Sequence, residues 1–481
     1  MMSGAKVLDF DTILYINLYR KRNLMKHTNT DIKADNLNTQ LNTNTQSNPD
    51  SCSPYKSSSS YGIFPDGTPI NNWFYSNYTK IESALQSPPA TASSYIITDY
   101  GIKDDGNIYT EQFQKLINSV YDNGGGYIII PDGTYMTGAL FFQPGVNLYI
   151  EKNGILKGSQ NITDYPVIKT RIEGETCLYY AALINVSHAD GFTIYGEGTI
   201  DGNGLYAWKC FWLRRSWNPD CTNKDEQRAR LLYISHSDNV TIYGIHMKDS
   251  QFWTCHIYKC THTAIYNCTI SSPRTPVKAP STDAIDIDAC SDVHIKGCRI
   301  NVNDDAVALK GGKGINAKAD SDNGLNERII IEDCIYDFCH GCLTCGSEAI
   351  HNRNIIMRNI RINNGYNLLW LKMRPDTPQL YEHILIKNVT GKISSFININ
   401  PWTQFSNIKN EASLKNGSYK KPHILLSYIN NITMKDCTCE CDAYYNVKED
   451  TSQYLINNIQ LIDNAITLMD NNNQQLHNNA E

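Results

Sequence analysis

Short apolar stretches interrupted by single Gly, Asn or Asp residues run through most of the chain. One four-residue phrase recurs: an apolar residue, any residue, Gly/Asn/Asp, then a small or branched apolar residue. Those three residue types accept the left-handed backbone conformation, so each phrase predicts a strand that turns a corner. Seven copies, with a weaker IYGE at Ile194, are IYGI, IYNC, IKGC, IEDC, MRNI, IKNV and MKDC, starting at Ile242, Ile265, Ile295, Ile331, Met357, Ile386 and Met434.

The spacing of these corners predicts the fold. Successive copies are 23, 30, 36, 26, 29 and 48 residues apart, without helices between them. We therefore predict an all-β, right-handed, single-stranded parallel β-helix whose coils stack about 4.8 Å apart. A β-sandwich would show alternation but no corner at a fixed place. The residues directly after four corners predict a column of buried thiols: Cys268, Cys298, Cys334 and Cys437.

Other patterns flank the solenoid. Residues 1–60 are polar and low in complexity, and we expect a disordered or leader segment there and a disordered tail at 466–481. We expect residues 61–94 to form an N-terminal extension that packs on the body, and residues 95–465 to form the β-helix domain. Helical spacing of apolar residues from Thr110 to Val120 predicts a short capping helix, with Thr110 as its N-cap.

Composition excludes several classes of protein. The 481 residues carry 43 basic and 49 acidic side chains, a net charge of −6, which disfavours nucleic acid or an anionic membrane as the partner. The apolar stretch at 13–19 is far shorter than the ~20 residues of a membrane span. Asp9 and Asp11 precede it and no small-residue cleavage site follows, so no clear signal peptide is visible.

Carboxylates concentrate in two neighbouring stretches, PSTDAIDIDAC (280–290) and NVNDDAVALKGG (301–312). Asp283 and Asp304 are 21 residues apart, close to one solenoid turn, so we expect Asp283, Asp304 and Asp305 to lie side by side on one outer face. Like charges held so close raise at least one pKa, which is typical of functional sites. Solvated acids or a Ca²⁺ site are the alternative interpretation.

His340 and Lys372 follow on later coils. Together with the three carboxylates they match a glycosidase site, in which one acid protonates the leaving oxygen and others activate water. Alone, His340 would be interpreted as a structural histidine. With Cys339, Cys342 and Cys345 it resembles a metal-ligand set, but alternate strand residues point to opposite faces, so we predict no metal.

The order of four motifs, STD (281–283), NDD (303–305), HG…GSE (340–348) and LK (371–372), resembles family 28 of the glycoside hydrolases, the polygalacturonases and their relatives, in its bacterial-type subgroup. Further similar stretches, which extend the resemblance over residues 95–440, are DYGIKDDG (99–106), GGGYIIIPDGTYMTG (124–138), LYIEKNGILKGS (148–159), GEGTIDGNG (196–204) and SQFWTCHIY (250–258).

The resemblance implies a right-handed parallel β-helix and inverting hydrolysis of pectic glycosidic bonds. Carried over by position, it implies that Asp304 is the general acid and that Asp283 and Asp305 orient the water. His340 and Lys372 would be supporting site residues. It also implies a secreted or extracytoplasmic location.

Two departures from the family pattern concern substrate binding. The family usually carries an Arg two residues before the site lysine, where this chain has Trp370, and Arg374 is our candidate replacement. The segment CFWLRRSWNPDC (210–221) is expected to be a loop. It is either a hydrophobic cover or a subsite wall whose arginines, with Arg230, pair with uronate carboxylates.

The sequence therefore predicts a monomeric glycosidase that binds pectic polysaccharide and needs no cofactor, nucleic acid or membrane. A pectate or rhamnogalacturonan lyase on the same fold is one alternative, and it would use Ca²⁺-neutralised uronate and a basic side chain. A non-catalytic β-helix that binds polysaccharide is the other. Product formation and dependence on a divalent cation distinguish these three activities.

Overall fold

The computed structural model describes residues 62–84, 87–404, 426–448 and 453–469. The expected leader segment 1–60 lies outside the described residues, as do residues 470–481 of the expected tail. Residues 466–468 belong instead to the last strand, so the solenoid continues slightly past the expected boundary at 465. No helix in the described ranges is both long enough and apolar enough to cross a membrane.

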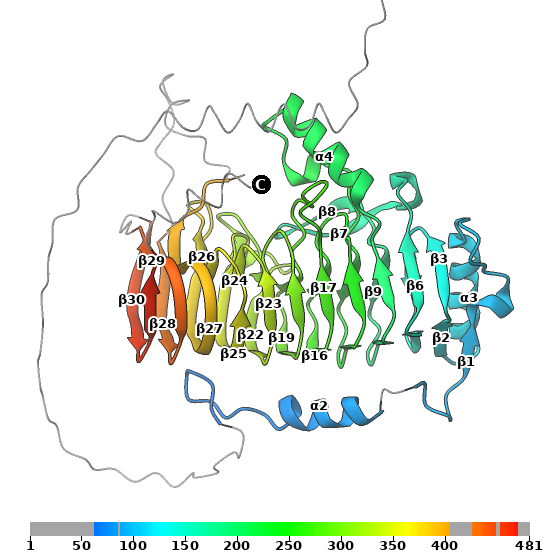
Figure 1. Ribbon diagram of the computed structural model, residues 1–481, viewed down its shortest axis with the longest axis horizontal. Coiled ribbons are helices and arrows are strands. Elements are labelled where there is room, and N and C mark those ends of the chain that lie inside the picture. The colour runs from blue at the N-terminus through cyan, green and yellow to red at the C-terminus, as the bar shows by residue number, and fades with distance from the viewer. Residues whose placement is uncertain (1–61, 85–86, 405–425, 449–452, 470–481) are drawn as a thin grey trace, which may run out of the picture.

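A parallel β-helix forms the body of the molecule, with its coils stacked along one axis (Figure 1). Three columns of parallel strands make up its faces. The first column contains β1 (Ser94–Ile96), β2 (Gly126–Ile130), β5 (Val146–Ile150), β10 (Thr193–Gly196), β13 (Thr241–Tyr243), β16 (Thr261–Tyr266), β19 (Ser291–Lys296), β22 (Leu325–Glu332), β25 (His351–Ile362), β27 (Leu380–Pro401), β28 (Ser427–Lys435) and β30 (Tyr454–Ile462).

The second column follows the corners of the first, and the later parts of β25 and β27 belong to it as well. It contains β3 (Gly133–Thr137), β6 (Gly154–Gly158), β11 (Thr199–Asp201), β14 (His246–Lys248), β17 (Thr269–Ser271), β20 (Arg299–Asn301), β23 (Ile335–Phe338), β29 (Thr438–Val447) and β31 (Ala465–Leu468).

The third column carries the candidate site, and the end of β27 pairs with its last member. It contains β4 (Leu140–Phe142), β9 (Ile184–Ser187), β12 (Leu232–Ser235), β15 (Cys255–Tyr258), β18 (Ile285–Asp288), β21 (Val307–Lys310), β24 (Gly341–Cys345) and β26 (Asn367–Met373). Short 3₁₀ turns are η2 (Ile97–Tyr100), η3 (Ile162–Asp164), η4 (Asn223–Asp225) and η5 (Ala317–Ala319).

The predicted corners are confirmed. All seven corner residues have φ between 53° and 76°: Gly244, Asn267, Gly297, Asp333, Asn359, Asn388 and Asp436. The first residues of successive phrases pair with one another in register, from Ile242 with Ile265 to Ile386 with Met434. The four cysteines that follow corners are buried in the main core, as predicted.

A helix covers the N-terminal end of the solenoid (Figure 1). This helix, α3 (Thr110–Asp122), buries Phe113, Leu116, Ile117 and Val120 in the main core, which confirms the capping helix. The predicted N-cap is wrong. Thr110 is the first helical residue, and its Oγ1 accepts a hydrogen bond from the Gly138 amide at 2.6 Å, which ties the helix to a coil instead.

The N-terminal extension lies along one side of the solenoid (Figure 1). It contains α2 (Trp73–Ala84). Phe64, Ile70 and Phe74 of the extension pack against Ile330 and Ile356 of the first strand column. These contacts bury apolar side chains that the outer face of a single coil would otherwise leave in water.

A hairpin and a helix that depart from the coil pattern lie on the upper side of the solenoid, opposite α2 (Figure 1). The hairpin is antiparallel and consists of β7 (Val167–Ile172) and β8 (Glu175–Tyr180). The helix is α4 (Leu205–Trp217), so the prediction of a loop for 210–221 is wrong. The helix buries Ala207, Trp208 and Phe211, a helical spacing that starts before the segment from which the loop was predicted.

Candidate active site

The candidate site lies where three successive coils enter the third strand column. Asp283 precedes β18, Asp304 and Asp305 precede β21, and His340 precedes β24. Because β18, β21 and β24 pair in parallel register, the residues before them meet at one edge. One oxygen from each of the three aspartates lies within 4.8 Å of the others, so the structure brings the predicted carboxylates together.

The three carboxylates differ in their access to solvent. The Asp304 side chain is 27% exposed, whereas Asp283 is 5% and Asp305 is 1% exposed. The Lys372 ammonium, from β26, donates a hydrogen bond to Oδ2 of Asp305 at 2.9 Å. Nδ1 of His340 lies 3.7 Å from Oδ1 of Asp304. The Asp304 carboxylate therefore faces solvent, whereas those of Asp283 and Asp305 are buried.

Lys310, at the end of β21, is the residue that sequence reasoning missed. Its Nζ lies 3.7 Å from carboxylate oxygens of Asp283, Asp286 and Glu348, and the side chain is 6% exposed. Burial lowers the pKa of Lys310, but these carboxylates outweigh burial and raise it well above its usual value. Lys310 therefore neutralises part of the negative charge beneath the cluster.

Burial and mutual repulsion separate the acidities of the carboxyl groups. Burial, Asp286 and Asp304 raise the pKa of Asp283 well above its usual value, against the opposing charge of Lys310. Burial raises the pKa of Asp286 to about 7. Burial also opposes ionisation of Asp304, but His340 and then Lys372 lower its pKa to about 2. In the free protein Asp283 and Asp286 therefore favour the protonated form, while Asp304 is ionised.

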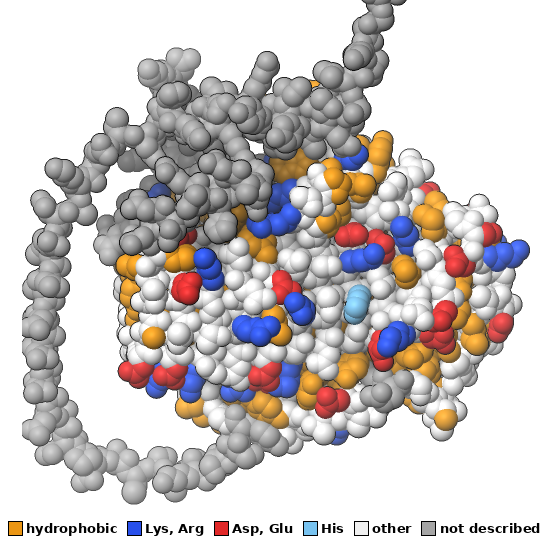
Figure 2. Space-filling view, viewed as in Figure 1, with side chains coloured by type: hydrophobic (Ala, Val, Ile, Leu, Met, Phe, Trp, Pro, Cys, Tyr) orange, Lys and Arg blue, Asp and Glu red, His pale blue; other side chains and the backbone are white. Residues whose placement is uncertain are grey.

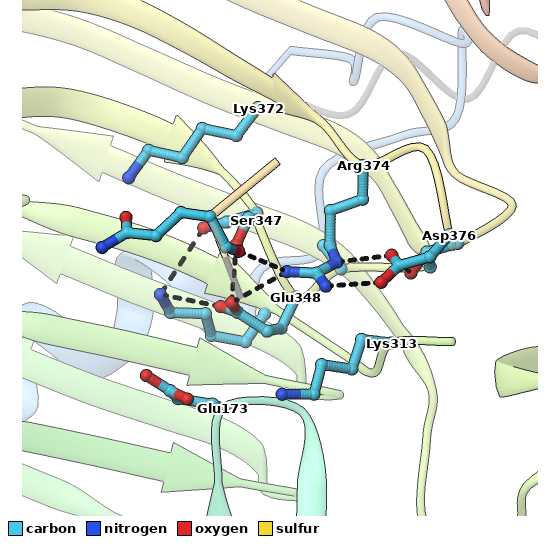
Figure 3. Close-up of polar contacts among 12 residues, drawn as sticks. Glu173, Lys313, Ser347, Glu348, Lys372, Arg374 and Asp376 are labelled. Carbon is cyan, nitrogen blue, oxygen red and sulfur yellow. Dashed lines mark hydrogen bonds and ion pairs between the residues drawn. The ribbon is translucent and has the colours of Figure 1, made fainter. Parts of the chain in front are cut away.

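Arg374 belongs to a buried ion-pair network with Glu348 and Asp376 (Figure 3). Glu348 also connects this network to Lys310. The Arg374 guanidinium donates to both carboxylate oxygens of Asp376, at 2.8 and 2.7 Å, and lies 3.6 Å from Glu348. Ser347 also donates to Glu348, at 2.5 Å. Arg374 is 1% exposed. Arg374 comes directly after Met373, the last residue of β26, so the alternation of side chains along the strand does not extend to it. Its side chain does not point to solvent, and it therefore does not replace an Arg at position 370.

Aromatic side chains surround Lys372. Its Nζ lies 4.1 Å from the centroid of the Trp370 ring and 4.9 Å from that of Trp402. Indole Nε1 of Trp370 donates to Asn400 at 3.3 Å. Trp370 therefore lies beside the site, where its ring contacts the ammonium of Lys372 in a cation–π geometry. That Trp370 also binds substrate stays a prediction.

Arg230 bonds to the β7–β8 hairpin and forms no ion pair with Asp283, Asp304 or Asp305. It donates to the carbonyl oxygen of Arg171 at 2.8 Å and to Oγ1 of Thr170 at 2.6 Å, and it is 1% exposed. A cavity of about 460 Å³ lies beside this hairpin, and none of the three site aspartates lines it. The position of Arg230 gives it a structural role in holding the hairpin on the third column.

Two groups of side chains resemble metal-ligand sets, the three aspartates and the cysteines around His340. The three aspartate oxygens are close enough to hold a cation, but the ammonium groups of Lys310 and Lys372 already contact two of the carboxylates. Cys339 and Cys342 are buried, with their Sγ atoms 3.5 Å apart. His340 instead turns outward and stacks on Tyr366, with ring centroids 5.0 Å apart, so imidazole and thiols do not converge.

Comparison with known proteins agrees with this geometry. The chain is 24% identical over 395 residues to an endo-polygalacturonase of Pectobacterium parmentieri, covering 76% of this chain and 92% of that protein. It is 28% identical over 231 residues to a probable polygalacturonase of Vitis vinifera, of which it spans 45%.

Solved structures show the same fold. An exopolygalacturonase from Thermotoga maritima aligns with a TM-score of 0.60 at 20% identity, over 82% of this chain and 96% of that chain. A polygalacturonase from Erwinia carotovora ssp. carotovora gives 0.58 at 20% identity, over 80% and 97%. The sequence profile of "Glycosyl hydrolases family 28" matches residues 156–479, most of the chain and the whole of the site described above. The chain belongs to the glycosyl hydrolases of family 28.

Proposed function

We propose that this enzyme hydrolyses glycosidic bonds of pectic polysaccharide, polygalacturonate or a related uronic-acid glycan, by inverting acid–base catalysis. The observation that carries the proposal is the unequal exposure of three aspartates whose oxygens lie within 4.8 Å of one another. The names of its relatives, endo-polygalacturonase and probable polygalacturonase, supply the substrate class. Because pectic polymers are extracellular, the enzyme is expected to act outside the cytoplasm.

Asp304 is the proposed general acid because its side chain is the most exposed of the three. It is ionised in the free protein, so it must gain a proton before it can give one to the leaving oxygen. A bound sugar excludes water from Asp304, and a uronate adds negative charge, and both effects raise the pKa of Asp304. Asp283, whose raised pKa favours its protonated form, lies within the same cluster, so the transfer of its proton to Asp304 is a short step.

Asp283 and Asp305 are the proposed pair that orients the attacking water. At 5% and 1% exposure they are too deep to reach an anomeric carbon as nucleophiles, whereas a water molecule is small enough to lie between them and the sugar. Inverting enzymes commonly separate acid and base by roughly 6.5–9.5 Å. The closest oxygens here are nearer than that, so burial, rather than separation, is the argument for inversion.

His340 and Lys372 are proposed to tune the two kinds of carboxyl. Lys372 donates a hydrogen bond to Asp305 at 2.9 Å, which fixes the orientation of that carboxyl group toward the water. His340 lies against Asp304 and its stacking on Tyr366 fixes the plane of the ring. Trp370 and Trp402 fix the position of the Lys372 ammonium.

Reducing-sugar release from polygalacturonate and from rhamnogalacturonan, measured side by side, tests the proposal. We expect hydrolysis of at least one polymer, without the ultraviolet absorbance of an unsaturated lyase product, and no loss of activity after chelation. Absorbing product that disappears with chelator would instead show a lyase. Binding to the polymers without release of reducing ends would show a non-catalytic module.

A further inference from the structure

A loop between β17 and β18 brings two cations to the outer side of the site. Arg274 and Lys278 are exposed, and Nζ of Lys278 lies 3.5 Å from Nε2 of His340. Lys310 and Lys372 contact carboxylates of the protein. Within the part of the chain that the structure describes, no carboxylate lies within ion-pair distance of the Lys278 ammonium, which leaves it able to contact an anion of the substrate.

The backbone of this loop is fixed by α4. Indole Nε1 of Trp212 donates to the carbonyl oxygen of Lys278 at 2.7 Å. Val277 and Ala279, on either side of Lys278, pack in a buried cluster with Trp208. A loop held through its main chain and flanking residues presents one long side chain at a defined place. The inserted helix thereby positions Lys278 beside the site.

Lys278, His340 and Asp304 form a row. An ammonium has no acceptor, so Lys278 donates to Nε2 and the imidazole proton lies on Nδ1, which faces Asp304 at 3.7 Å. Burial lowers the pKa of Lys278, Asp304 raises it and Arg274 lowers it again. An anion bound beside Lys278 would favour its charged form.

The chemistry of a 4-linked uronate fits this row. The leaving oxygen is attached to C4 of the leaving unit, and the carboxylate of the same unit is attached to the neighbouring C5. If Asp304 protonates that oxygen, the carboxylate lies beside Asp304, where a cation is needed to bind it. Position 370, where related enzymes usually carry an Arg, holds a tryptophan that contacts Lys372 instead.

We propose that Lys278 binds the carboxylate of the uronate on the leaving-group side of the scissile bond and so selects an acidic unit there. This inference rests on the proposed function. It assigns a specificity-determining residue that shares a loop with the STD motif but lies outside the four motifs that carry the family resemblance. It also gives α4 a role, because α4 holds that loop.

The test compares polygalacturonate with its highly methyl-esterified form, in which the carboxylate charge is absent. Wild type, Lys278→Gln and Lys278→Arg are assayed on both polymers, with circular dichroism to confirm folding. Lys115→Gln is the matched control, because Lys115 lies on α3 with 79% of its side chain exposed. Charge-assisted hydrogen bonds are worth enough that their loss lowers kcat/KM by about 10- to 100-fold.

We expect Lys278→Gln to lose about that much kcat/KM on polygalacturonate, mainly through KM, and less than about threefold on the methyl ester. Lys278→Arg should recover most of the loss and Lys115→Gln should behave as wild type. Equal losses on both polymers would overturn the inference and assign Lys278 to the support of His340. If wild type hydrolyses neither polymer, the proposed function fails and the inference falls with it.

Discussion

Replacing Lys310 by Met tests whether the buried ammonium holds the carboxylate cluster together. Nζ of Lys310 lies 3.7 Å from oxygens of Asp283, Asp286 and Glu348, with only 6% of the side chain exposed. Methionine has a similar length and no charge, so the substitution removes the cation with little change in packing. The three carboxyl groups would then lack their shared counter-ion.

The expected cost follows from how many of those charges remain. At 3.7 Å and an effective dielectric constant near 20, each ion contact is worth roughly 4.5 kcal/mol before desolvation. Asp283 and Asp286 have raised pKa values, so they lose their negative charge by taking up protons when Lys310 is absent. In the wild type, Lys310, Arg374 and Lys313 outweigh burial and lower the pKa of Glu348 to about 2. Without Lys310, Glu348 keeps Arg374 at 3.6 Å but loses one of its partners. Removing one partner of a buried ion pair costs about 3–5 kcal/mol, and because Arg374 remains we expect the lower end of that range, about 3 kcal/mol, at pH 8.

The sign of the pH dependence is part of the prediction. A carboxyl whose folded pKa lies above its unfolded pKa contributes stability below the folded pKa and loses it as pH rises through that value. Lys310 lowers the pKa of Asp283 and Asp286, so removing it raises both further. The variant should therefore be destabilised less at pH 5 than at pH 8.

Urea unfolding followed by circular dichroism at both pH values measures the effect, with the midpoint shift multiplied by the mean m-value. Lys152→Met is the control, because Lys152 pairs with Glu197 on the surface, where both side chains are more than 70% exposed. Its loss should be below about 1 kcal/mol. If Lys310→Met also lowers the free energy of unfolding by less than about 1 kcal/mol, or lowers it equally at the two pH values, the role given to this lysine is refuted.

Three further predictions concern the reaction. Asp304→Asn should lower kcat by ~10²–10⁴-fold without changing the circular dichroism spectrum, because the amide cannot supply the proton. A variant that keeps more than a tenth of wild-type activity would exclude Asp304 as the general acid. Asp283→Asn and Asp305→Asn should each remove most activity, and the double variant should lose less than the product of the two losses, since both hold one water; multiplicative losses would mean independent roles. Proton NMR of the first product, before mutarotation, should show the anomer opposite to that of the bond cleaved, and a retained anomer would make one of these aspartates a covalent nucleophile.

The fold was predictable because its corners depend on local backbone chemistry. Residues such as Asn267 and Asp333 adopt the left-handed conformation that their short polar side chains tolerate, and the phrase around each one is visible in the sequence. The α4 helix and the β7–β8 hairpin were not predicted, because they lie between coils and carry no such phrase. Their positions are set by tertiary contacts, such as that of Trp208 with Val277.

The sequence predicted those parts of the site that follow from the register of neighbouring coils. Asp283 and Asp304 were paired correctly because their spacing is close to one coil. Lys310 was missed, although it pairs directly with Asp288 of the previous coil and the acid-rich IDID run could have indicated a buried cation. Arg374, the candidate replacement for an Arg at position 370, is instead buried and paired with Asp376, because it follows Met373, where β26 ends.

The proposed reaction depends on residues from four consecutive coils, those that contain β18, β21, β24 and β26. In a solenoid, stability is approximately a sum over neighbouring coils, like a one-dimensional lattice with nearest-neighbour coupling. Fraying of the C-terminal coils on heating would leave activity intact until it reached β26, whereas one break between β18 and β24 would abolish it. Enzymatic activity thus reports the melting of one short central block, and it should not track the loss of total strand content.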